Sequence, residues 1–170
     1  MPELHFIAWK EVRLHGRGFG KKLAYAILRA KESGSKAVIA TVDCDNAQPR
    51  SRLRQLSDAR ELDRAKNPPF PTALGEANPH LEAWLLDDNV AVRRAIQLPT
   101  DIAIPNCKDV ASPKDALNDI VRKQEASQLS YVEALGMIAA CVDPKRCVHA
   151  KDTGFAAFVD DVRHELAAQI

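Results

Sequence analysis

The chain has 170 residues, of which 46% are hydrophobic and 28% are charged, and its formal net charge is +1. This length and composition predict one globular domain, residues 1–170, with a substantial core. No apolar stretch approaches the roughly 18 residues that a membrane span requires. The start Met-Pro-Glu-Leu-His is unlike a signal sequence, so membrane and secreted classes are excluded and we expect a cytoplasmic protein.

The four cysteines of the chain have irregular spacings, which in a reducing compartment indicates free thiols rather than a disulfide framework. A zinc site at Cys141, Cys147 and His149 is an alternative. No fourth ligand follows at a finger-like spacing, so zinc is disfavoured.

Positive charge is concentrated at the start of the chain, where residues 1–36 hold eight Lys and Arg against three Glu. A basic end beside an acidic centre suits a surface that binds a polyanion next to a metal ion. The candidate phosphate contacts are Lys21, Lys22, Arg50, Arg52 and Lys114. Lys114 is unusual because a cation opposes the helix dipole in a first turn. The alternative is a solvated helix face.

The first third of the chain predicts a strand-helix-strand unit. Residues 4–9 are β-prone, and residues 10–20 form a basic loop whose glycines lack the spacing of a nucleotide-binding loop. A helical apolar period follows from Phe19, and Gly34 ends it. Residues 36–43 then predict a second strand, parallel to the first.

The middle of the chain predicts a charged helix from Pro49 to about Ala65, then a strand or extended segment over residues 70–77. We expect Asn78 and Pro79 to open the next helix as its cap and first residue. After an irregular segment, Ser112 and Ser130 each begin a capping-box pattern. A final helix is expected from near Thr153, so the last third is helical.

The most informative stretch is Ala37 to Asp45, a buried strand that ends in Asp-Cys-Asp. Side chains two apart on a strand share a face, so Asp43 and Asp45 are candidate ligands for Mg²⁺ or Mn²⁺. Glu76 and Glu82 are candidates to complete the metal shell or to act as general base, with His80 a weaker candidate. The alternatives are turn chemistry for the aspartates and helix-dipole stabilisation for Glu82.

Three sequence blocks carry a resemblance to a known family. They are Thr-Val-Asp-Cys-Asp, Gly-Glu-Ala-Asn-Pro-His-Leu-Glu-Ala-Trp-Leu-Leu-Asp-Asp and Ser-Pro-Lys-Asp-Ala-Leu, and the resemblance extends from about Gly16 to the C-terminus. The chain resembles an uncharacterised bacterial family related to Toprim domains and to overcoming-lysogenisation-defect nucleases. Members are often encoded beside SMC-like or ABC-like ATPases, sometimes in phage-defence islands.

The resemblance implies an α/β, Toprim-like (Rossmann-like) fold, with a mostly parallel sheet flanked by helices. It implies a metal-dependent nuclease in which Asp43 and Asp45 bind the metal and Glu82 is a signature acid. Toprim domains also carry a glutamate at the end of an early strand, and neither Glu3 nor Glu11 has that place. We therefore expect the usual first strand and helix to be missing, the centre to be degenerate, or Glu76 or Glu82 to substitute.

Two other functions stay open from the sequence. A non-catalytic Toprim-like subunit would dock on a partner ATPase, and the missing glutamate favours it. A phosphatase or phospho-acceptor would use Asp43 as nucleophile, because one aspartate at a strand end can do so. The sequence lacks the hydroxyl residue two positions after the second aspartate that the haloacid-dehalogenase pattern has.

Overall fold

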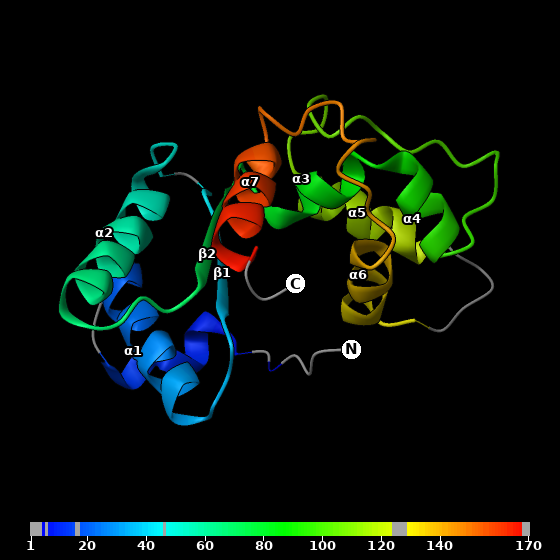
Figure 1. Cartoon of the computed structure of the whole chain (residues 1–170). Helices are drawn as coiled ribbons and strands as arrows, with labels where there is room; N and C mark the ends of the chain where they lie inside the picture. Colours follow the sequence, from blue (N-terminus) through cyan, green and yellow to red (C-terminus); the bar gives the residue numbers. More distant parts are fainter. Residues whose placement is uncertain (1–4, 6, 16–17, 46, 124–128, 168–170) are drawn as a thin grey trace.

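The computed structural model describes residues 5, 7–15, 18–45, 47–123 and 129–167. It is a helix-rich mixed α/β structure in which a short parallel sheet lies between groups of helices (Figure 1). None of the helices it describes is long and apolar enough to cross a membrane. The elements in chain order are η1 (Trp9–His15), α1 (Phe19–Glu32), β1 (Val38–Asp43), α2 (Ser51–Lys66), β2 (Thr72–Ala77), α3 (Leu81–Leu86), α4 (Asn89–Ala95), α5 (Pro113–Arg122), α6 (Tyr131–Ala139) and α7 (Phe155–Leu166).

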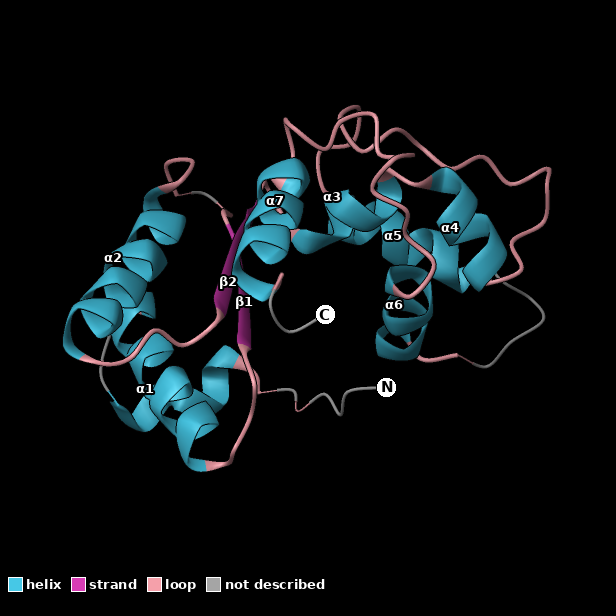
Figure 2. Cartoon of the chain, in the orientation of Figure 1, coloured by secondary structure: helices cyan, strands magenta, loops and turns pink. Residues whose placement is uncertain are grey.

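The sheet of the described residues has two parallel strands, β1 and β2, joined through α2 (Figure 2). Val38 pairs with Thr72 and Asp43 with Ala77, so the two strands end together. The prediction of both strands is confirmed, and their parallel pairing requires the crossover that α2 supplies. The expected parallel sheet is thus present in its smallest form.

The expected strand over residues 4–9 is wrong in its described part, because Trp9 begins the 3-10 helix η1. The indole of Trp9 packs edge-on against Phe19, with ring centroids 5.5 Å apart, and donates to the carbonyl of Thr41 at 2.7 Å. Tertiary packing of this one side chain therefore outweighs the β-propensity of the segment. Leu4, Phe6 and Gly16 of the predicted strand and loop lie outside the described residues.

Helices cover both faces of the sheet (Figure 1). On one face, Leu23 and Ile27 of α1 and Leu56 of α2 are fully buried against the strands. On the other face, α7 packs along β2, and the ring of Phe158 in α7 stacks on the ring of Trp84 with centroids 5.1 Å apart. The sheet is therefore the middle layer of an α/β/α arrangement, as the alternation of apolar segments predicts.

The helical part between β2 and α7 has its own core. Leu86, Val92, Ile96, Leu117 and Ile138 are among its buried side chains. The capping box predicted at Ser130 is confirmed, with Glu133 as its partner; at Ser112 the hydroxyl accepts the amide of Asp115, which is the serine half of the predicted box. Helix α4 was not predicted, since its seven residues provide too short an apolar period.

Helix α3 begins at Leu81, three residues after the predicted cap at Asn78, so that boundary is wrong. His80 is extended, with φ −138° and ψ 158°, and its side chain makes no capping hydrogen bond. The amide of Leu81 instead donates to the carboxylate of Asp43 at 2.8 Å. A residue from the end of β1 thus caps α3, which no local sequence pattern indicates.

Candidate metal and phosphate site

The candidate site lies where the two parallel strands end. Asp43 is the last residue of β1 and pairs with Ala77, the last residue of β2. Asp45 follows two residues later, and His80 and Glu82 come from the start of α3. The carboxyl ends of parallel strands are the usual place for ligands in open α/β sheets, so the topology favours a site here.

Asp43 is the central carboxylate of this group. Burial raises the pKa of Asp43 above its ordinary value, and the nearby negative charges of Glu82 and Asp45 raise it further. The hydrogen bond from Leu81 opposes this but does not cancel it. The negative charges of Asp45 and Glu82 therefore both act on Asp43.

Asp45 does not continue the strand. Its backbone has φ +48°, so the alternation of side chains along β1 does not extend to it. Its carboxylate pairs with Arg52 at 2.6 Å and with Nε2 of His80 at 3.4 Å, and its side chain is 44% exposed. Arg52 also donates to the carbonyl of Asp43 at 2.6 Å, which ties the start of α2 to the end of β1.

Glu76 has a structural task. Its carboxylate accepts the backbone amides of Arg52 at 2.9 Å and Leu53 at 2.7 Å, and also that of Arg50. Arg50 is left-handed, with φ +67°, and provides no side-chain cap of its own. The carboxylate of Glu76 therefore caps α2 from the neighbouring strand and complements the helix dipole.

Glu82 is only 9% exposed and accepts a hydrogen bond from the hydroxyl of Tyr131 at 3.0 Å. Burial raises the pKa of Tyr131, and the adjacent carboxylate of Glu82 raises it further, so the phenol stays a donor. The sequence predicts Glu82 in the first turn of its helix, which is confirmed, but gives no indication of its burial. Tyr131 was missed, because α6 and α3 are far apart in the sequence.

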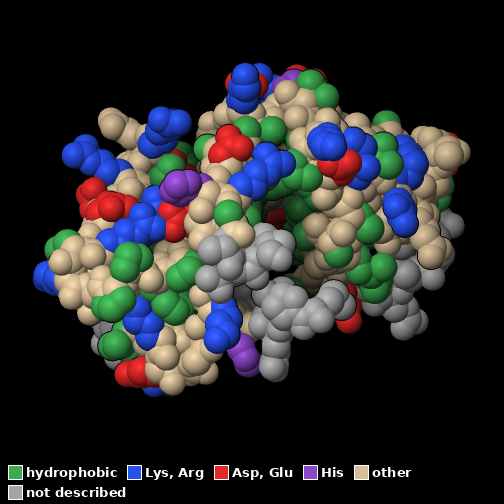
Figure 3. Space-filling model, viewed as in Figure 1, with side chains coloured by type: hydrophobic (Ala, Val, Ile, Leu, Met, Phe, Trp, Pro, Cys, Tyr) green, Lys and Arg blue, Asp and Glu red, His purple; other side chains and the backbone are tan. Residues whose placement is uncertain are grey.

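The predicted phosphate contacts do not form one surface. Arg52 lies in the site, whereas Nζ of Lys22 donates to the carbonyl of Trp9 at 3.1 Å. Lys21, Arg50 and Lys114 are exposed, on or beside three different helices. Figure 3 shows Lys and Arg spread over one face of the molecule with Asp and Glu between them. Of the five cations, Arg52 is therefore the one that the geometry links to the acidic residues.

The donor set around Asp43 leaves several atoms free. Among the described residues, Oδ2 of Asp43 and Oε2 of Glu82 have no hydrogen-bond partner, and Nδ1 of His80 is buried without one. Within the same residues, no three His, Cys, Asp or Glu side chains converge closely enough to enclose a metal ion. The described residues therefore offer fewer than three convergent side chains, not a closed cage.

The cysteines of the chain are free thiols in the structure. Cys44, between the two aspartates, is buried, and this burial raises the pKa of its thiol. A protonated buried thiol is a poor nucleophile, so the chemistry of the site rests on its carboxylates, His80 and Arg52.

Comparison of this chain with protein-family models, with curated proteins and with solved structures finds no match.

Proposed function

We propose that this protein is a Toprim-like, metal-dependent nuclease that hydrolyses phosphodiester bonds. The observation that carries the proposal is the place of Asp43, a half-buried carboxylate at the carboxyl end of β1 that accepts the amide of Leu81 at the start of α3, next to His80 and Glu82. Burial and the charges of Glu82 and Asp45 raise the pKa of Asp43, which supports it. Groups of like charge in one site cost free energy that a bound cation removes, and perturbed carboxylates concentrate at functional sites.

The donor set fits Mg²⁺ or Mn²⁺. Mg²⁺ in nucleic-acid enzymes keeps several waters and is held by one or two carboxylates together with substrate phosphates. Asp43 and Glu82 each have one carboxylate oxygen without a partner in the described part of the chain, and Asp45 lies beside them. A closed three-ligand cage is therefore not required for this kind of metal binding.

The bound cation would stabilise charge on a non-bridging phosphate oxygen and activate a water. Arg52 would hold the substrate phosphate through guanidinium N–H groups other than Nη1, because Nη1 donates to Asp45 and to the carbonyl of Asp43. His80 positions Asp45, because its Nε2 lies 3.4 Å from that carboxylate. Glu76 is not part of this chemistry, because its carboxylate is occupied by the amides of α2.

The cellular setting is part of the proposal. The protein acts in the cytoplasm on DNA or RNA, with an SMC-like or ABC-like ATPase as partner and phage defence as a role. Lys21, Lys22, Arg50 and Lys114 are further contacts for a long nucleic acid that extends over several helices.

The alternative is a non-catalytic Toprim-like subunit that docks on a partner ATPase. One observation favours it: Asp45 and Glu76 are bound to protein partners, Arg52 and the amides of α2, which is how purely structural carboxylates behave. In this alternative the acidic residues hold β1, α2 and α3 together and bind no metal.

The test is cleavage of supercoiled plasmid, single-stranded DNA and single-stranded RNA by the purified chain with Mg²⁺, Mn²⁺ or EDTA. The comparison is the Asp43→Asn/Asp45→Asn double variant, with Asp58→Asn/Asp101→Asn, two exposed aspartates, as the matched control. We expect metal-dependent cleavage that falls at least about tenfold in the site variant and is unchanged in the control. Cleavage by wild type and site variant at equal rates contradicts the proposal, as does no cleavage with either metal.

A further inference from the structure

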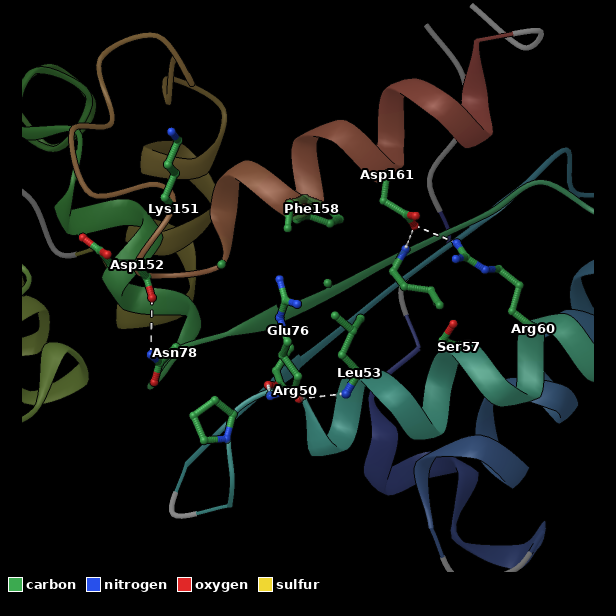
Figure 4. A pocket seen from close by; sticks show the side chains of 15 residues that line it. Arg50, Leu53, Ser57, Arg60, Glu76, Asn78, Lys151, Asp152, Phe158 and Asp161 are labelled. Carbon is green, nitrogen blue, oxygen red and sulfur yellow. Dashed lines mark hydrogen bonds and ion pairs between the residues drawn. The ribbon is translucent and has the colours of Figure 1, made fainter.

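A cavity of about 300 Å³ lies between α2 and α7, beside the outer edge of β2 (Figure 4). Figure 4 shows side chains from the two helices facing each other across the strand, Leu53 and Ser57 from α2 and Phe158 from α7. Small-molecule sites begin at about this volume. The cavity therefore has room for one small ligand.

The floor of the cavity is a strand edge with unused hydrogen-bonding groups. Alternate residues of β2 face away from β1. The outward amide of Leu74 donates to Asp161 at 2.7 Å, and that of Asn78 donates to the carbonyl of Thr153 at 3.0 Å. Between them, the amide of Glu76 and the carbonyl of Leu74 have no hydrogen-bond partner in the part of the chain that the structure describes. Glu76 is only 8% exposed, and a buried backbone group without a hydrogen-bond partner costs free energy. A ligand that pairs with this donor and acceptor removes that cost.

Among the described residues, three acids line the cavity, of which Glu76 is held by backbone amides of α2 and the other two by cations. Its carboxylates have partners: Asp161 pairs with Arg60 at 2.8 Å, and Asp152 pairs with Lys108 at 2.6 Å. By contrast, Arg50 and Lys151 line the cavity and make no ion pair with any residue that the structure describes. Lys151 lies at the Asn78 end, away from Arg60 and Asp161 (Figure 4). An anionic group on the ligand is therefore expected at that end.

We infer that this cavity binds a nucleotide. The base lies between Leu53 and Phe158 with its polar edge on the amide of Glu76 and the carbonyl of Leu74. The phosphate is held by Arg50 and Lys151.

A nucleotide matches each feature of the cavity. A base edge presents a donor and an acceptor side by side, as the amide of Glu76 and the carbonyl of Leu74 do on the outer edge of β2, and a flat ring suits apolar walls. A phosphate accepts charge-assisted hydrogen bonds from guanidinium and ammonium groups. The cavity does not use Asp43, Asp45 or Glu82, so this inference does not rest on the proposed nuclease activity.

The test is ligand titration of the full chain in EDTA, followed by amide NMR and by calorimetry. The probes are AMP, adenosine and inorganic phosphate. We expect AMP to bind more tightly than either fragment and to shift the amide signal of Glu76. Lys151→Ala and Arg50→Ala are expected to weaken AMP binding about tenfold each, since each removes one charge-assisted contact. Ser57→Phe, which fills the cavity from α2, is expected to abolish binding.

The matched controls are Arg54→Ala on the same helix and Lys145→Ala before the same loop, both exposed and outside the cavity. They are expected to bind AMP as wild type does. The inference is overturned if AMP does not bind, if phosphate alone binds as tightly as AMP, or if the controls weaken binding as much as Lys151→Ala.

A nucleotide can arrive free or as part of a nucleic-acid chain, and a 5′-phosphorylated dinucleotide distinguishes the two. Equal shifts of the Glu76 amide by AMP and the dinucleotide, with tighter binding of the dinucleotide, identify a chain as the source. Tighter binding of AMP identifies a free nucleotide. If AMP binds in EDTA but the protein cleaves no nucleic acid with metal, the nucleotide inference holds and only the nuclease proposal fails.

Discussion

The carboxylate of Glu76 accepts the backbone amide of Leu53 at 2.7 Å, so one side chain joins the end of strand β2 to the first turn of α2. The same carboxylate also accepts the amides of Arg50 and Arg52. Since Arg50 offers no cap of its own, this contact satisfies donors that would otherwise stay unpaired at the start of a 16-residue helix.

Substitution of this carboxylate is predicted to destabilise the fold. Glu76→Ala leaves three part-buried amides at the start of α2 without an acceptor, and we expect a loss of about 1–3 kcal/mol in the free energy of unfolding. Glu76→Gln keeps one acceptor oxygen and is expected to lose less. Urea unfolding measures both, with the exposed Asp58→Ala on the same helix as control. Equal stability of Glu76→Ala and the control would show that the contact contributes nothing.

Substitution of Asp43 is predicted to raise the free energy of unfolding, whereas substitution of Glu76 lowers it. The pKa of Asp43 is raised above its ordinary value of 3.8 by burial and by Glu82 and Asp45, so its ionised form costs stability at neutral pH. This cost disappears as the pH falls through the folded pKa. Asp43→Asn keeps an acceptor for the amide of Leu81, and we expect it to stabilise the protein at pH 7, with a gain that shrinks in acid. Thermal unfolding at several pH values tests this, and a gain that grows in acid would refute it.

The buried carboxylate of Asp88 is predicted to stabilise α4 and the loop after α6. It accepts the amide of Ala91 at 3.0 Å, the amide of Asp143 at 2.9 Å and the guanidinium of Arg146. Burial acts to raise the pKa of Asp88, but these hydrogen bonds outweigh it and the pKa is lowered. The stabilisation is therefore present above the ordinary value of 3.8 and is lost as the pH falls through the folded pKa.

Asp88→Ala is expected to cost about 2 kcal/mol at pH 7, because a cap and a buried amide lose their acceptor. Unfolding in urea from pH 7 to about pH 2 measures this cost, which should stay constant above pH 3.8 and shrink below it. The exposed Asp109→Ala serves as control. A cost that does not depend on pH would exclude the ionised carboxylate as its source.

Two glycines are predicted to respond oppositely to alanine. A Cβ at Gly75 would lie 2.7 Å from Cδ2 of Phe158 and 3.0 Å from the ring of Trp84, so Gly75→Ala must displace these stacked rings and costs about 1–3 kcal/mol. A Cβ at Gly136, inside α6, would meet nothing within 4 Å, so Gly136→Ala is expected to stabilise by about 0.5–1 kcal/mol. Chemical unfolding of the two variants side by side decides the matter, and similar effects would contradict the packing described.

Local patterns in the sequence predict most of the helices and both strands. The apolar run before Asp43 gives β1, and the capping box at Ser130 gives α6 with its start at Tyr131. In these elements the residues that decide the structure lie within a few positions of one another, so period and caps are sufficient.

The contacts that the sequence does not reveal are long-range. Asp43 caps α3 from 38 positions away, and Glu76 caps α2 from 23 to 26 positions away. Both acids were predicted as site residues, and the structure gives each a capping contact. Trp9 likewise lies in a helical turn, where its indole donates to the carbonyl of Thr41 and packs against Phe19. Tertiary partners of this kind have no signature in a single sequence.

The most direct test of the proposed site is Mn²⁺ binding followed by the electron paramagnetic resonance signal of free Mn²⁺. Wild type, Asp43→Asn and the exposed control Asp101→Asn are titrated at pH 7 without nucleic acid. The account predicts one bound Mn²⁺ in wild type and control, with affinity at least about tenfold weaker in Asp43→Asn. Equal binding by all three proteins, or no binding by wild type, would contradict a metal site at the end of β1.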